Sequence, residues 1–332
     1  MGILVGIDEA GYGPHLGPLV VAAAAMEFPG ETHPDPDLWA ALGQHVCKRP
    51  SGAGSRVLVC DSKVAYPGEG NVGPLERTVL GYLAATGARP LRLSDLLSAA
   101  AVQPTATAAA DDPVPQPWEH PQALSLPAST PTEEIDAAAA RLTEGLALLG
   151  GRALRLWVNV ASAARLNRLM DASRNKARAL FALTADLLAA AMDLRPSDPI
   201  HVTMDSHGGR RYYAGLLAGA FPMTPVETLS ESAAVSRYRL VRDGPVPPGK
   251  APVYLTICNR CETWSLATAL ASMAAKYVRE LHMLQLNAYF GSLVPGLRPT
   301  AGYGRDAWRF LDEVADARAL GRIEDAQILR SR

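Results

Sequence analysis

Acidic side chains end two short strand-like runs in this chain of 332 residues. Residues 3–7 are apolar and lead directly into Asp8 and Glu9, and a glycine-rich turn follows. A second, β-branched run at residues 200–204 ends at Asp205. Glycine lets the backbone of the turn approach a ligand closely because it carries no side chain. If the sheet brings both strand ends to one edge, three carboxylates meet beside this turn.

A fourth acid, Glu280, lies on a long helix that we expect over residues 262–289. Polar side chains recur along it every four residues and therefore form one stripe. The stripe comprises Thr268, Ser272, Lys276 and Glu280. Alanines beside the stripe let the helix pack closely on a sheet. The stripe then presents Glu280 to the other acids if they lie at the same edge.

Four carboxylates in a small space raise one another's pKa because like charges repel. Divalent cations remove this conflict, and Mg²⁺ and Mn²⁺ prefer hard oxygen ligands. Two such ions about 3.5–4 Å apart activate water and stabilise the leaving oxygen in phosphodiester hydrolysis. The residue types therefore indicate a two-metal Mg²⁺ or Mn²⁺ site made by Asp8, Glu9, Asp205 and Glu280.

Each of these acids also has a plain structural interpretation, and for Asp8 and Glu9 it is a solvated turn at the end of a strand. Asp205 is of the type that caps a turn, here at residues 206–208. Glu280 can pair with the lysine one helical turn before it. His207 is either an acid/base group beside Asp205 or a surface-loop histidine. Arg210 and Arg211 either bind phosphate or form a solvated basic turn.

Five segments, in order along the chain, resemble the motifs of the type 2 ribonuclease H family, ribonucleases HII and HIII. They read GIDEAGYGP at residues 6–14, GPLVVA at 17–22, DSK at 61–63, ASMAAKYVRE at 271–280 and AGYG at 301–304. Asp205 falls where the family has its third acid, at the end of a strand. The resemblance implies an α/β ribonuclease H-like fold, with a mixed central sheet flanked by helices and a C-terminal helical segment.

The resemblance implies a metal-dependent endonuclease that hydrolyses the RNA strand of RNA–DNA hybrids, or ribonucleotides embedded in DNA. The products carry a 5′-phosphate and a 3′-hydroxyl. The catalytic metal ligands would be Asp8, Glu9, Asp205 and Glu280, with Asp8 bridging both ions. The substrate-binding residues would be Gly11, Tyr12, Gly13, Lys63, Lys276 and Tyr303. Of these, the turn contacts the ribose 2′-hydroxyl, Lys63 contacts a phosphate, and Lys276 either contacts a phosphate or holds the acids in place. Tyr303 stacks on a sugar or simply packs as an ordinary aromatic.

Two residues depart from the family pattern. Tyr12 stands where ribonuclease HII has Arg and ribonuclease HIII has Lys, so the turn lacks a cation for the neighbouring phosphate. Glu280 stands where ribonuclease HII usually has Asp. Two alternatives to the main hypothesis follow: a catalytically weak nucleic-acid-binding protein of this fold, or a nuclease of this fold that acts on DNA.

The composition is that of a globular protein, with 48% hydrophobic and 20% charged residues. A net charge of −1 requires nucleic acid to be bound by a local basic patch. The apolar run at residues 19–26 is far shorter than the roughly 20 residues that span a membrane. Cys258 and Cys261 have metal-like spacing but need two further ligands, so we expect reduced thiols. We expect a cytoplasmic monomer without membrane contact.

The chain reads as one domain over residues 1–332. Residues 87–150 look like an insertion, in which a Pro/Ala-rich loop at 98–130 precedes a helix. Thr130 as N-cap, Pro131 at the first helical position and Glu133 predict a capping box at the start of that helix. Further strands are expected at 19–28, 56–60, 154–160 and 252–258, and one or two helices at 163–192. Residues 290–332 form a C-terminal helical extension.

Overall fold

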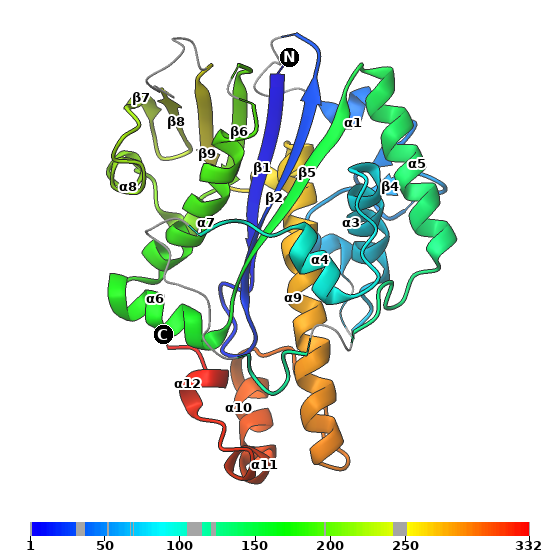
Figure 1. The fold of residues 1–332 in the computed structure, drawn as a ribbon, viewed down its shortest axis with the longest axis vertical. Helices are drawn as coiled ribbons and strands as arrows, with labels where there is room; N and C mark the ends of the chain where they lie inside the picture. Colours follow the sequence, from blue (N-terminus) through cyan, green and yellow to red (C-terminus); the bar gives the residue numbers. More distant parts are fainter. Residues whose placement is uncertain are drawn as a thin grey trace.

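The computed structural model describes residues 2–30, 37–51, 53–66, 68, 70–104, 115–120, 124–195, 197–241 and 251–331. Its centre is a seven-stranded sheet in the order β5-β2-β1-β6-β9-β8-β7 (Figure 1). In that order the strands are Arg152–Ala161, Leu19–Phe28, Gly2–Ala10, Ile200–Asp205, Val253–Cys258, Val235–Leu240 and Val226–Glu231. The strands β1, β6 and β9 are parallel, and the other neighbours pair antiparallel. The expected mixed sheet is therefore confirmed.

Helices cover both faces of this sheet (Figure 1). One face carries α3 (Gly73–Ala85), α4 (Leu93–Ala99), α5 (Thr132–Leu148) and α9 (Leu266–Leu293). The other carries α6 (Ala163–Ser173), α7 (Lys176–Met192) and α8 (Ala214–Ala220). Short elements complete this part of the fold: α1 (Leu38–Ala41), α2 (Ser62–Ala65), the paired strands β3 (Val46–Cys47) and β4 (Val57–Leu58), and the 3₁₀ turns η2 (His207–Gly209) and η3 (Cys261–Thr263).

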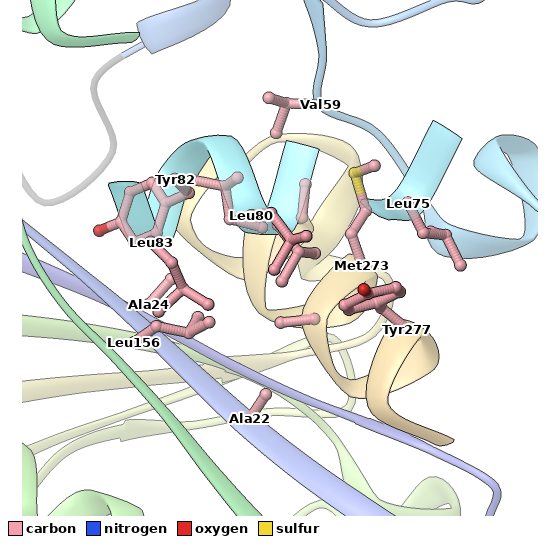
Figure 2. Packing of buried hydrophobic residues seen from close by; sticks show 14 of the residues in the cluster. Ala22, Ala24, Val59, Leu75, Leu80, Tyr82, Leu83, Leu156, Met273 and Tyr277 are labelled. Atoms are coloured by element: carbon pink, nitrogen blue, oxygen red, sulfur yellow. The ribbon is translucent and has the colours of Figure 1, made fainter. Parts of the chain in front are cut away.

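The strand β2 shows why the sheet is covered twice. Every one of its residues is buried, and alternate residues enter the two hydrophobic clusters on opposite faces. Such a continuous apolar run is typical of a strand with helices on both sides. Figure 2 shows one of these layers, in which Leu80 and Leu83 of α3 and Met273 of α9 pack above Ala22 and Ala24.

The helix α9 runs along β1 at very short range. A Cβ atom placed on Gly6 would lie 2.0 Å from the carbonyl carbon of Ala267, so only glycine allows this approach. Ala271 and Ala274 are fully buried in the same layer. The alanines expected to let this helix pack on the sheet therefore do so, and they place its polar stripe against the end of β1.

The C-terminal helices α10 (Gly304–Glu313), α11 (Ala315–Leu320) and α12 (Asp325–Ile328) extend below the sheet in Figure 1. They pack on Leu16 and on Phe290 of α9 in a third hydrophobic cluster. The chain then returns to the glycine-rich turn. Arg330 donates a hydrogen bond to the carbonyl of Gly17 at 2.7 Å and another to the carbonyl of Gly11. The expected C-terminal helical segment is confirmed and braces that turn.

The structure differs from the sequence expectations at three places. The strands β7 and β8 were not expected, and the run at 56–60 contributes only two strand residues. The helix α5 has Pro131 as N-cap and forms no capping box. The reason is that Thr130 is used elsewhere: its N–H donates to Glu76 at 2.7 Å and its hydroxyl to Gly73. Residues 105–114 and 121–123 of the Pro/Ala-rich loop lie outside the described residues.

Among the residues that the structure describes, no helix has both the length and the apolar character needed to cross a bilayer.

Candidate active site

Three of the four expected acids come together at the carboxyl ends of the parallel strands β1 and β6. Ile7 pairs with Met204, so the residues that follow them, Asp8 and Asp205, lie side by side. Asp8 is 9% exposed and accepts the N–H of Glu9 at 2.7 Å. Asp205 accepts the N–H of Cys261 at 3.2 Å. Register alone therefore juxtaposes these carboxylates.

The three acids perturb one another electrostatically. Burial raises the pKa of Asp8 well above its usual value, and the charges of Glu9 and Asp205 raise it further, against a hydrogen bond from Ser272. Burial and the Asp205 charge raise the pKa of Glu9 to about 7. Burial also raises the pKa of Asp205, with backbone N–H groups opposing it. Excess negative charge is thus concentrated here without full compensation.

Lys63 is a cation that faces this cluster. Its positive charge lowers the pKa of both Glu9 and Asp205. The side chain is exposed, and its helix α2 is capped by Asp61, which accepts the N–H of Lys63 at 2.9 Å. Lys63 is therefore held at the rim of the acids, where an incoming anion would meet it.

The structure does not bring Glu280 to this cluster. Its carboxylate accepts hydrogen bonds from Lys276 at 2.7 Å, Arg279 at 2.6 Å and the Tyr66 hydroxyl at 2.9 Å. Burial raises its pKa, but the charges of Arg279 and Lys276 outweigh that and the net pKa is lowered. Glu280 also lies eight residues beyond Ser272, which is about 12 Å of helix rise. The polar stripe is real, but its last acid is used to neutralise buried cations.

Glu262 occupies the position near Asp205 that Glu280 was expected to take. It lies in η3, directly before α9, and is 8% exposed. Burial raises its pKa, and the charges of Asp205 and Asp61 raise it further. Its signal in the sequence is an acid four residues after the run that ends at Cys258, whereas the acids at the other two strand ends follow their runs directly. Placing residue 262 inside a helix concealed that signal.

The glycine-rich turn packs closely against its neighbours because Gly11 has no side chain. Gly11 has a φ of +90°, and a Cβ atom there would lie 2.7 Å from the Pro18 carbonyl and 2.9 Å from the Arg279 side chain. Tyr303 lies beside the turn, with its Cε1 atom 3.9 Å from the position that a Cβ on Gly13 would take. It is 46% exposed and covers the Arg279 guanidinium at 5.3 Å. Tyr303 therefore offers one ring face to solvent next to the turn.

Tyr12 and Lys276 each take part in a cation–π contact. The Lys176 ammonium lies 5.1 Å from the centre of the Tyr12 ring. Lys276, besides its ion pair with Glu280, lies 4.4 Å from the centre of the Tyr66 ring. Each cation thus faces an aromatic ring, a contact worth about 0.5–1 kcal/mol at exposed sites.

His207 matches neither interpretation given above. It is 2% exposed, packs edge-on against Phe181 and Tyr213, and has Nε2 3.3 Å from the Thr184 hydroxyl. Burial lowers its pKa to about 3, so it stays neutral near pH 7. It is a core histidine that fixes the loop after Asp205.

Cys258 and Cys261 are joined as a disulfide, contrary to the expected reduced thiols. The pair closes the loop between β9 and η3. Since the Cys261 N–H donates to Asp205, this link holds the backbone beside one of the acids. Cys47 and Cys60 are free and buried.

The donor chemistry at this edge fits a divalent cation. Asp8, Glu9, Asp205 and Glu262 supply only carboxylate oxygens, the ligands that Mg²⁺ and Mn²⁺ prefer. Burial is the main cause of their raised pKa values, and the charges of neighbouring acids raise those of Asp8, Glu9 and Glu262 further. Across the described ranges, however, no three acid, histidine or cysteine side chains converge closely enough to hold an ion between them.

Comparisons with known proteins found similar solved structures but no similar sequences. The chain aligns over 99% of its length with 94% of a ribonuclease HII from Archaeoglobus fulgidus, solved in complex with PCNA, at 16% identity and a TM-score of 0.44. It aligns over 99% with 66% of Bst-RNase HIII in complex with Mn²⁺, at 15% identity and a TM-score of 0.42. A ribonuclease H2 from Pyrococcus horikoshii matches 98% of the chain at 12% identity, with 92% of its own length covered and a TM-score of 0.40. No protein-family model and no curated protein matched.

Proposed function

We propose that this protein is a metal-dependent endonuclease that hydrolyses RNA paired with or joined to DNA, leaving a 5′-phosphate and a 3′-hydroxyl. One observation carries the proposal: Asp8, Glu9 and Asp205 meet at the ends of β1 and β6, with raised pKa values. Acids clustered against their own repulsion are a common feature of functional sites. Two of the family-like segments reach this cluster: Ser272 donates a hydrogen bond to Asp8, and Lys63 faces Glu9 and Asp205.

The proposed metal ligands are Asp8, Glu9, Asp205 and, in place of Glu280, Glu262. All four lie on three neighbouring segments, the ends of β1 and β6 and the turn after β9. A divalent cation bound there would activate water and neutralise charge on the departing oxygen. Lys63 would contact the phosphate of the substrate, because it lies at the rim of the same cluster.

The glycine-rich turn would contact the ribose next to the cut. Gly11 lets the turn pack against Pro18 and Arg279, and Gly13 keeps the backbone open beside the Tyr303 ring. Tyr303 offers a ring face there on which a sugar can stack. Lys276 has a different proposed role. Its ammonium is paired with Glu280, so it positions that carboxylate and the Tyr66 hydroxyl and does not bind phosphate directly.

A cleavage assay with four labelled duplexes tests the proposal. The panel holds an RNA–DNA hybrid, DNA with one embedded ribonucleotide, all-DNA and all-RNA, each with Mg²⁺ and then Mn²⁺. We expect cutting only where ribose meets DNA, and none in the Asp8→Asn variant. Cutting of all-DNA would instead indicate a DNA nuclease of this fold.

The second candidate is a nucleic-acid-binding protein with little activity. Two observations favour it: the turn carries Tyr12 in place of a cation, and the net charge of the chain is −1. This candidate predicts binding to the hybrid that survives Asp8→Asn, with no cleavage by either protein in either metal. The panel above therefore separates it from the main proposal.

A further inference from the structure

A small polar pocket of about 120 Å³ lies next to Asp205, outside the acid cluster. It is formed by Ser206 and by residues 209–211, 232–236 and 257–259, at the ends of β6, β8 and β9. No carboxylate is among these described lining residues. Such a volume holds several water molecules or one tetrahedral oxyanion. The pocket continues the row of strand ends that carries the acids.

Arg210 brings an unsatisfied cation to this pocket. Its Nε is buried and has no hydrogen-bond partner among the described residues. Its backbone is held by a 3.0 Å hydrogen bond to the His207 carbonyl, and Gly208 and Gly209, both with positive φ, turn the chain before it. A solvated basic turn would leave the whole guanidinium in water. Here one donor is withdrawn from water without compensation, which costs free energy unless a ligand supplies an acceptor.

The loop that carries Arg210 is anchored on both sides of the pocket. The Ser236 hydroxyl of β8 donates to the carbonyl of Arg211 at 2.7 Å. Ser206 donates to the Oδ1 atom of Asn259. That bond uses the acceptor of the amide, so the Asn259 nitrogen remains as a donor at the pocket wall. The lining thus combines two guanidinium groups with amide and hydroxyl donors.

Arg210 also adjoins the glycine-rich turn. A Cβ atom placed on Gly208 would be 3.1 Å from the Tyr12 hydroxyl, so the two loops touch. Burial and the charge of Glu9 raise the pKa of Tyr12, and the charge of Arg210 opposes this rise, so Arg210 faces the Tyr12 hydroxyl. The other cation at Tyr12, Lys176, already faces the aromatic ring. Within the described part of the chain, Arg210 therefore brings an unpartnered donor to the side of the turn that carries Tyr12.

We propose that this pocket binds one phosphate of the substrate backbone, and that Arg210 supplies the cation that the turn lacks at Tyr12. This inference rests on the proposed function, because it takes the ligand to be a nucleic acid. A guanidinium fork matches two phosphate oxygens at once and loses less hydration than an ammonium. Such a contact positions the strand across Asp205 without reading its sequence.

The first test measures binding against salt concentration. The protein carries Asp8→Asn so that it does not cleave, and the probe is a fluorescent RNA–DNA hybrid titrated between about 50 and 200 mM salt. We expect Arg210→Gln to weaken binding about tenfold, as for the loss of one charge-assisted hydrogen bond. The slope of log K against log salt should become shallower by about 0.7–0.9, the value for one phosphate contact.

Arg155→Gln is the matched control. This substitution makes the same change of charge as Arg210→Gln. Arg155 lies at an exposed position on β5, an edge strand of the sheet. β5 lies three strands from β6 in the sheet, which is about 14 Å at about 4.8 Å per strand and exceeds the screening length of about 8–10 Å. Arg155→Gln should therefore leave the slope of log K against log salt unchanged. A second variant, Arg210→Lys, keeps the charge and loses the fork, so it should retain the slope and weaken binding only in part.

The second test locates the phosphate. Hybrids with a single neutral methylphosphonate at each position around the cut are bound to both the Asp8→Asn protein and its Arg210→Gln derivative. At the contacted position the two changes should be non-additive, since either one alone removes the interaction. Additive losses at every position would overturn the assignment of Arg210.

The outcomes also separate this inference from the proposed function. If the Asp8→Asn protein binds no nucleic acid at low salt and the unmodified protein does not cleave, the proposed function fails and the inference with it. If hybrids are cut and bound but Arg210→Gln behaves like Arg155→Gln, only the phosphate pocket is refuted. A circular dichroism spectrum identical to that of the parent protein establishes that each variant is folded.

Discussion

Replacing Glu262 and Glu280 separately by glutamine should have opposite consequences, although both are buried glutamates beside α9. Glu262 carries a charge that its surroundings disfavour, as its raised pKa shows. Glu280 carries a charge that Arg279 and Lys276 stabilise, as its lowered pKa shows. We expect Glu262→Gln to lose activity while remaining fully stable, and Glu280→Gln to lose stability while remaining active when folded.

The magnitudes follow from the contacts. Arg279 is fully buried, so Glu280→Gln leaves its guanidinium without a counter-charge, which costs about 3–5 kcal/mol. Unfolding entropy of about 2.1 cal/mol/K per residue amounts to about 0.7 kcal/mol/K for this chain. The expected fall in Tm is therefore about 4–7 °C. Loss of a metal ligand exceeds the roughly 10–100-fold effect of removing its supporting groups, so Glu262→Gln should reduce cleavage at least about 100-fold.

The assay combines thermal unfolding after removal of metal with cleavage of a hybrid at about 20 °C below the Tm of the less stable variant. A Mg²⁺ titration adds an independent readout, because Glu262→Gln should raise the concentration needed for half-maximal activity. The reasoning is refuted if Glu280→Gln abolishes cleavage while folded and Glu262→Gln keeps the Mg²⁺ dependence of the parent protein. That result would mean that the Glu280 carboxylate breaks its ion pairs with Lys276 and Arg279 and moves to the acid cluster.

Three further outcomes are expected. Glu76→Gln should lower the Tm by about 4 °C. The buried Glu76 carboxylate accepts hydrogen bonds from three backbone N–H groups of residues 128–130 and from the Tyr277 hydroxyl, and an amide would leave some of these donors unpaired at a cost of about 3 kcal/mol. Tyr277→Phe leaves the backbone donors satisfied and should cost about a third of that, so equal losses would contradict the argument. Without metal, the free energy of unfolding should fall as pH rises from about 4.5 to about 7. The pKa of Glu9 is raised to about 7, so the folded state binds this proton more tightly than the unfolded state does. Denaturant titrations at several pH values should show a weaker pH dependence of stability for Glu9→Gln, and an unchanged pH dependence would refute this. Adding Mg²⁺ at about 100 times its Kd should stabilise the parent protein by about 2.7 kcal/mol and so raise its Tm by about 4 °C. The rise in Tm should be smaller for Asp8→Asn. Equal rises in the two proteins would mean that the ion binds elsewhere.

Local patterns were sufficient where the signal was strong and bounded. The apolar runs that became β1, β2, β5, β6 and β9 are ended by glycines, acids or turn residues, and each formed a strand close to its expected limits. The two strands that were not expected lack this signal. In β7 nearly every side chain is exposed, and β8 alternates arginines with buried residues, so neither reads as an apolar run. β7 pairs with β8, and β8 pairs with β9, the next strand along the chain, so these two strands are defined by their pairing and not by an apolar run of their own.

The start of α5 shows how a tertiary contact overrides a local rule. Thr130, Pro131 and Glu133 have the spacing of a capping box, which is a contact within four residues. Glu76, 54 residues earlier, offers a buried carboxylate to the N–H of Thr130 and its neighbours. A charged acceptor for several donors is stronger than one hydroxyl cap, so the helix begins one residue later.

The sequence by itself determined which residues have the chemistry for this site and which elements bear them, because residue type and short-range periodicity are local properties. It identified Asp8, Glu9 and Asp205, and the structure brings them together. The tertiary structure decided that Glu262 and not Glu280 adjoins them, and that Arg210 withdraws a donor from water beside the turn. Both outcomes depend on burial and on charge partners far apart in sequence, such as Tyr66 and Glu280, which are 214 residues apart. No local pattern carries that information.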